Sequence, residues 1–283
     1  MMPKSTKYVL SGLNAPEKKN CPPQSTVPCL EIHQEGLLPI NEGCCPFFQE
    51  YFLQMRDYDS KKPLICIHIP KTAGTSLQYV LKEWFGKGFR RHYFDEKNEK
   101  MPEKVRLKKR FLFQRYIPNL CICGHFNQER GFGVLDYYPE VDQFITILRD
   151  PLELHLSNYF FVKRRAAVGV SWRDGKELEL KFETVDDYLR NTRSFISLFL
   201  PWDITLENFQ EVLEKKFIHI GVASKLQRSV DILAEKLKKK KVSVPVKNVS
   251  LRDEEPSQSA MTDFKERHRL EYAIYEYVVE LNK

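Results

Sequence analysis

The residues best suited to bind an anion lie together in the segment IHIPKTAGTSL, residues 67–77. An apolar run ends there, and the small residues that follow predict a loop and then a helix beginning near Gly74. The first N–H groups of a helix lack partners within the helix, so they attract anions. The residues expected to contact the anion are Lys71, Thr72, Ala73, Gly74, Thr75 and Ser76.

In this loop Gly74 would let a phosphate approach the backbone closely, because glycine has no Cβ. A Walker A loop needs a glycine five residues before its Gly-Lys-Ser/Thr. Here Lys71 precedes the glycine, and Ile69 holds the position five before it, so the loop is of another kind. An ordinary strand-to-helix turn is the alternative. The lysine, the glycine and three hydroxyls within residues 71–76 favour a phosphate loop.

A second motif, LRDPLELHLSNY at residues 148–159, offers a further anion contact. Asp150 has the position of a helix N-cap, followed by a proline suited to the first turn. Arg149 would then stand at the end of a strand, beside a helix N-terminus, with Ser157 two turns along the helix. A guanidinium donates two parallel hydrogen bonds to a phosphate. The alternative is that Arg149 pairs with a structural carboxylate and Ser157 occupies a helix surface.

His125 is the best candidate for a general base, because it follows the apolar run 120–123 and a glycine. That position is the carboxyl end of a predicted strand, where open α/β sheets bind ligands. His92, in the basic segment FRRHY, is the second candidate for the base or a substrate contact. His68 lies within the first strand and is expected in the core or directly behind the site residues, and the side on which His155 faces is left open.

Short apolar runs alternate with helical patterns along most of the chain. Strands are predicted at residues 64–69, 120–123, 143–148 and 217–222. Helices are predicted at residues 47–55, 74–85, 103–116, 184–192, 206–216, 224–240 and 262–281, with a further helix starting after residue 148. Thr262 is the predicted N-cap of the last one. This alternation predicts a three-layer α/β fold with a mostly parallel sheet flanked by helices.

Residues 1–46 are rich in proline, lysine and cysteine and show no sustained period, so we expect an extended or partly disordered extension before a domain at 47–283. Cys66 and Cys121 fall in apolar runs and are expected to be buried thiols. The seven cysteines show no paired zinc spacing, so no metal is expected. A disulfide among the first 45 residues is left open.

The net charge of +7 favours anionic partners without choosing among them. The lysine run at 238–241 ends a predicted helix, where cations complement the helix dipole, so nucleic-acid binding is not expected. No stretch has the ~18–20 consecutive apolar residues of a membrane span. The chain as it stands suggests a cytoplasmic protein. A fragment from the secretory lumen that lacks its anchor is the alternative.

With both motifs in view, HIPKTAGTSL resembles the 5′-phosphosulfate loop of carbohydrate sulfotransferases related to heparan sulfate 2-O-sulfotransferase, and RDPLELHLSNY is similar to their 3′-phosphate motif. The resemblance covers roughly residues 63–281. It implies a P-loop-like fold and the donor 3′-phosphoadenosine 5′-phosphosulfate (PAPS), released as 3′-phosphoadenosine 5′-phosphate (PAP). Many relatives have arginine where this chain has Leu154. More weakly, it brings Asn248 and Ser250 near the nucleotide.

By this resemblance, Lys71 and the loop hold the 5′-phosphosulfate, while Arg149 and Ser157 hold the 3′-phosphate. His125 would deprotonate a hydroxyl acceptor, either an anionic glycan held by the basic clusters or a small alcohol. The sequence gives neither the acceptor nor the oligomeric state. Two alternatives remain: a Mg²⁺-dependent kinase with a divergent phosphate loop, and a non-catalytic module that binds PAPS or another anion.

Overall fold

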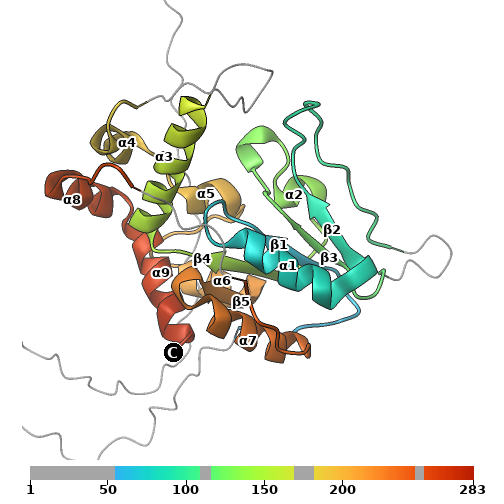
Figure 1. Cartoon of the computed structure of the whole chain (residues 1–283). Coiled ribbons are helices and arrows are strands. Elements are labelled where there is room, and N and C mark those ends of the chain that lie inside the picture. The colour runs from blue at the N-terminus through green and yellow to red at the C-terminus, as the bar shows by residue number, and fades with distance from the viewer. Residues whose placement is uncertain (1–54, 109–115, 169–181, 246–251) are drawn as a thin grey trace, which may run out of the picture. The chain divides into compact units, whose positions relative to one another are not determined.

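Figure 1 shows the computed structural model of the chain, which describes residues 55–108, 116–168, 182–245 and 252–283. The predicted extension at 1–46, most of the predicted helix at 47–55, and residues Asn248 and Ser250 lie outside these ranges. Within them, no helix has the length and apolar composition that crossing a bilayer requires.

The centre of the fold is a five-stranded sheet in which every neighbouring pair is parallel. Its strands, in spatial order, are β2 (Phe89–His92), β3 (Cys121–Gly124), β1 (Leu64–Ile67), β4 (Phe144–Leu148) and β5 (Phe217–Val222). The four predicted strands are all present. The basic strand β2 was missed, because the edge sequence FRRH has too few apolar residues to give a strand signal.

The central strand β1 pairs with β3 on one side and with β4 on the other. Ile67 is in register with Gly124 of β3 and with Thr146 of β4, so the three strands end at nearly the same level. Because the strands are parallel, the loops that follow them leave from one edge of the sheet. The chain order reverses across β1, and such a switch point is where open α/β sheets bind ligands.

Helices of the described ranges cover both faces of the sheet (Figure 1). They are α1 (Gly74–Phe85), α2 (Val134–Tyr137), α3 (Pro151–Ala167), α4 (Val185–Asn191), α5 (Phe195–Phe199), α6 (Phe209–Lys216), α7 (Leu226–Leu237), α8 (Gln258–Arg267) and α9 (Arg269–Leu281). The observed α1 has the predicted bounds. The start of α3 is also as expected, because the Asp150 side chain accepts a hydrogen bond from the Glu153 N–H and Pro151 occupies the first turn.

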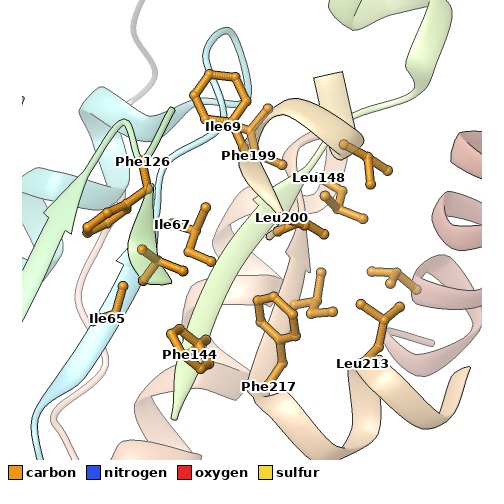
Figure 2. Close-up of a cluster of buried hydrophobic side chains, with 14 of the residues drawn as sticks. Ile65, Ile67, Ile69, Phe126, Phe144, Leu148, Phe199, Leu200, Leu213 and Phe217 are labelled. Atoms are coloured by element: carbon orange, nitrogen blue, oxygen red, sulfur yellow. The ribbon is translucent and has the colours of Figure 1, made fainter. Parts of the chain in front are cut away.

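Successive residues of β1 point to opposite faces, which gives the domain two cores. Leu64 and Cys66 pack with α1 and α7 in one cluster, where Cys66 and Cys121 are buried free thiols as predicted. Ile65 and Ile67 pack with α5, α6 and α9 in the other. Figure 2 shows this second core, in which Phe144 and Phe217 come from neighbouring strands. The three-layer α/β arrangement is therefore confirmed.

A third, smaller core joins α3, α4 and α8. The predicted last helix at 262–281 is wrong at its start, because α8 begins at Gln258 and its N-cap is Ser257, whose hydroxyl accepts from the Ala260 N–H. Thr262 lies inside α8 and donates its hydroxyl to the Gln258 carbonyl. The periodicity predicted one helix here. The structure has two, α8 and α9, which meet at His268.

The predicted helix at 103–116 is also wrong over its described residues, which form no regular secondary structure at 103–107. The Val105 N–H donates to the Tyr138 hydroxyl at 3.1 Å, and the Ile117 N–H donates to the Leu107 carbonyl at 2.7 Å. Lys108 and Tyr116 form an antiparallel bridge. Tertiary partners therefore take the backbone groups that a helix would need.

The two-sided core predicts that Phe217→Ala will destabilise the domain by about 3–5 kcal/mol, because it removes a ring with no exposed surface between β4 and α6. Urea unfolding monitored by circular dichroism measures this loss. Leu206→Ala is the matched control, because Leu206 is 40% exposed and its loss should change the free energy little. Equal effects of the two changes would contradict the packing described here.

Candidate functional site

A cavity of about 530 Å³ lies at the carboxyl edge of the sheet, where the loops after β1, β3, β4 and β5 meet. It brings together nearly all of the predicted site residues that the structure describes. Those that line it are Lys71, Ala73, Gly74, Thr75, Ser76, His125, Arg149 and Ser157. His68, Phe161 and Tyr275 also line it and were not predicted to contact a ligand. Segments about 200 residues apart in the chain thus share one site.

The loop after β1 has the backbone shape of an anion site. Lys71 (φ 66°) and Ala73 (φ 63°) both adopt the left-handed conformation, although neither is a glycine. Such residues are strained and persist where the surrounding structure holds them. Alternation of left-handed and right-handed residues turns successive N–H groups toward one point, which makes an anion-binding concavity. Ala73 is the N-cap of α1 and gives its first turn no side-chain acceptor.

The predicted hydroxyl donors of this loop divide into two kinds. Thr72 is buried and donates to the Ile69 carbonyl at 2.8 Å, so it supports the loop and its side chain does not reach the main cavity. Ser76 lines the cavity but donates to the Pro245 carbonyl at 2.8 Å. Thr75 lines the cavity and is exposed. Of the three hydroxyls predicted to contact the anion, those of Thr72 and Ser76 thus donate within the fold, and Thr75 is exposed at the cavity.

Gly74 has a steric role in addition to the predicted one. A Cβ atom on this residue would lie 1.7 Å from Nε2 of His68, so any other residue type would collide with the imidazole. The close approach that glycine permits is thus to the His68 ring. His68 itself was expected in the core or directly behind the site residues, but it follows the end of β1 and faces the cavity.

Arg149 links the loop after β4 to the loop after β1. Its Nη1 donates to the Lys71 carbonyl at 3.3 Å, and its Nη2 donates to Glu153 at 3.1 Å. The same Glu153 oxygen accepts from Arg252. Partial burial would raise the pKa of Glu153, but Arg252 and Arg149 hold it below its usual range. Arg149 therefore does pair with a structural carboxylate, which was the alternative to a ligand contact. It lines the cavity nevertheless.

Arg149 and Arg164 lie close to Lys71, although Asp150 and Glu153 also line the cavity. Burial, Arg164 and Arg149 together lower the pKa of this lysine. Its ammonium lies 4.0 Å from the centre of the Phe161 ring, which offers it a weak cation–π contact. Cations gathered this closely repel one another, and a bound anion would relieve the repulsion.

His125 has the tautomer that a general base needs. Its Nδ1 lies 2.7 Å from the His68 carbonyl oxygen, which can only accept, so Nδ1 carries the hydrogen and Nε2 has a free electron pair. Burial lowers its pKa to about 4, which keeps the ring neutral near pH 7. His92, the second candidate for the base, is fully buried, stacks on Phe126 and does not line the cavity.

Within the described ranges, one group of side chains could share a metal ion: His155, His268 and Glu271, with one ligand atom each within 4.8 Å of the others. The Glu271 carboxylate already accepts hydrogen bonds from Ser194, the Ile196 N–H and His268. We call His155, His268 and Glu271 the buried clamp, because these bonds explain the group as a link that holds α3, α5 and α9 together. The sequence had given no hint of it, because its members are remote in the chain.

No protein-family model and no curated protein matches this chain. What the site does must therefore be inferred from the chemistry of its own residues.

The contact between Gly74 and His68 predicts that Gly74→Ala will destabilise the domain by about 1–3 kcal/mol through overpacking. In a His68→Ala background the same change should be neutral or stabilising, because alanine favours the helix. A double-mutant cycle by urea denaturation measures the coupling. An equal loss in both backgrounds would show that His68 does not impose the glycine.

The buried clamp predicts a pH effect. Burial would raise the pKa of Glu271, but the neighbouring His155 and hydrogen bonds from His268 and the Ile196 N–H hold it far below its usual range. Its ionised form therefore stabilises the fold fully above about pH 4.3, the pKa of an unfolded glutamate, and this contribution is lost as the pH falls further.

We expect Glu271→Gln to lower the free energy of unfolding at pH 7 by about 1–3 kcal/mol. The gap between wild type and variant should narrow from pH 5 to pH 3, because the wild type loses the carboxylate's contribution. Urea titrations at several pH values test this. A gap that stays constant or widens on acidification would contradict the assignment.

Proposed function

We propose that this chain is a sulfotransferase that moves a sulfuryl group from PAPS to a hydroxyl acceptor, on a fold of the P-loop-like class. One observation carries the proposal: Lys71, Arg149 and a neutral imidazole with a free Nε2 line one cavity. Lys71 and Arg149 follow different strands of the sheet. This arrangement suits a ligand that has an anionic group at each end and a reactive group that faces the base.

The donor would lie across the end of β1. The loop containing Lys71 and the N-terminus of α1 would bind the 5′-phosphosulfate through backbone N–H groups and the ammonium. Arg149 would bind the 3′-phosphate with Ser157, which lines the cavity two turns into α3. Only two N–H groups of the guanidinium are used by Lys71 and Glu153, and arginine has five. Donors therefore remain for a phosphate.

When bound, PAPS supplies a sulfuryl group joined to a phosphate oxygen that can leave. His125 would accept the acceptor's hydroxyl proton on Nε2 as that oxygen bonds to sulfur. Lys71 and the α1 N-terminus would stabilise the negative charge on the departing phosphate oxygen as its bond to sulfur breaks. The chain's own residues thus supply the positioning, base and charge stabilisation that group transfer of this type requires.

An anionic acceptor would need basic side chains near the cavity, and some of these already form ion pairs within the protein. Arg130 pairs with Glu96 and stacks over Phe94, and Lys163 pairs with Asp253 and Glu254. Arg91 is exposed on β2, beside the strand that carries His125. An anionic glycan would contact this edge, whereas a small alcohol would need only the cavity.

The kinase alternative requires an acidic residue at a strand end to hold Mg²⁺. Asp150 is so placed and lines the cavity, but one of its oxygens accepts the Glu153 N–H at 3.0 Å as the cap of α3. No observation favours this alternative over sulfuryl transfer, and nucleotide binding separates the two.

PAP should therefore raise the Tm of the protein, and 5′-AMP or ATP with Mg²⁺ should do so less. Binding at 100 times Kd stabilises a fold by about 2.7 kcal/mol, which a thermal shift detects easily. Arg149→Ala should weaken the PAP response, while Arg193→Ala, which removes an arginine with 85% of its side chain exposed, should not. A Mg²⁺-dependent response to ATP without one to PAP would favour the kinase and overturn the proposal.

Turnover tests the base. His125→Ala should reduce transfer of radiolabelled sulfur from PAPS to a panel of glycans and small alcohols by about 100- to 10,000-fold, while PAP binding is retained. Wild-type turnover in the variant would rule out His125 as the base. A wild-type protein that binds PAP but transfers sulfur to none of these acceptors would favour the non-catalytic module.

A further inference from the structure

We propose that His68 is a second functional imidazole, which donates a hydrogen bond from Nε2 to an oxygen of the sulfuryl group during transfer. This inference rests on the proposed function and adds to it a contact that is made at the reacting centre. It assigns Tyr93 and Gln78 as positioning residues that set the tautomer of the ring.

The hydrogen bonds around the ring determine which nitrogen carries the hydrogen. The Gln78 amide nitrogen donates to the Tyr93 hydroxyl at 2.7 Å. Nδ1 of His68 lies 2.7 Å from this hydroxyl and 3.5 Å from the same Gln78 amide nitrogen, and both groups can donate to it. Nδ1 therefore accepts, and in a neutral ring the hydrogen is on Nε2.

The His68 ring lies between the start of α1, where the leaving phosphate would bind, and His125, the proposed base. Its Nε2 is so close to Gly74, at the start of α1, that a Cβ there would lie 1.7 Å away. The ring also stacks on that of His125, with ring centres 4.3 Å apart and planes inclined by 25°. The sulfuryl group must pass from the α1 side to the His125 side, so a donor between them faces the oxygens that stay on sulfur.

The two imidazoles have complementary roles because their tautomers are opposite. His68 accepts at Nδ1 and offers a donor at Nε2, whereas His125 donates at Nδ1 to the His68 carbonyl and offers an acceptor at Nε2. Burial and the neighbouring His125 hold the pKa of His68 well below its usual range. Both rings therefore stay neutral, and only His125 takes the acceptor's proton while His68 keeps its own.

Preorganised donors aimed at developing charge contribute strongly to catalysis, because they need no rearrangement in the transition state. The arrangement of Gln78, Tyr93 and His68 has this character. Its three members come from α1, the end of β2 and the end of β1, so the fold itself holds the donor in position.

Histidine proton–nitrogen correlation spectra of the wild-type protein test the tautomers without any acceptor. Between pH 5 and pH 8 we expect His68 as the neutral Nε2–H form and His125 as the neutral Nδ1–H form. In Tyr93→Phe, the His68 signal should lose this single form. Finding the Nδ1–H form of His68 in the wild type would overturn the proposal.

Kinetics test the donor. His68→Ala should lower kcat by about 100- to 1,000-fold with little change in PAP binding, because the contact forms at the transferred group. His68→Gln carries an N–H near the position of Nε2, and its kcat should be roughly tenfold above that of His68→Ala. Equal kcat values in wild type and His68→Ala would overturn the proposal.

The two levels of the account fail in different ways. If PAP does not stabilise the wild type, the sulfotransferase assignment fails, whatever the His68 variants do. If PAP binds and sulfur is transferred, but His68→Gln is no better than His68→Ala and Tyr93→Phe has wild-type kcat, only the role of His68 is wrong.

Discussion

The functional site depends on the parallel pairing of β1 with β3 and β4. This pairing ends the three strands at one level, because Ile67 is in register with both Gly124 and Thr146. The loop with Lys71, the base candidate His125 and the loop with Arg149 must therefore emerge side by side. Burial of β1 on both faces fixes the register, since a slip by one residue would exchange its two core-facing sides.

Local electrostatics set the charge and the protonation state of the side chains that line the cavity. The cavity holds Lys71 and Arg149 close together at a loop whose backbone already attracts anions. Its two imidazoles are kept neutral by burial, and one backbone carbonyl, that of His68, sets the tautomer of His125. The site thus has a side with Lys71 and Arg149 and a side with two neutral imidazoles. Our proposal of sulfuryl transfer rests on this separation.

Much of this could be predicted from the sequence where the signal was local. The apolar runs predicted four strands, and the helix starts at Gly74 and Pro151 followed from proline, glycine and capping residues. Tertiary contacts decided the rest. The backbone at 103–107 is held by partners such as Tyr138, so the helix that its apolar spacing predicted does not form. The role of Gly74 depends on a ring that packs against it only in the folded chain.

Amide chemical-shift changes during a titration with PAP test the central claim most directly. If the loops after β1 and β4 form one donor site, the largest changes will occur together at residues 71–76 and 149–157, at the same PAP concentration. ATP with Mg²⁺ should produce smaller changes there. Changes confined to one of the two segments, or found elsewhere in the domain, would contradict a shared site.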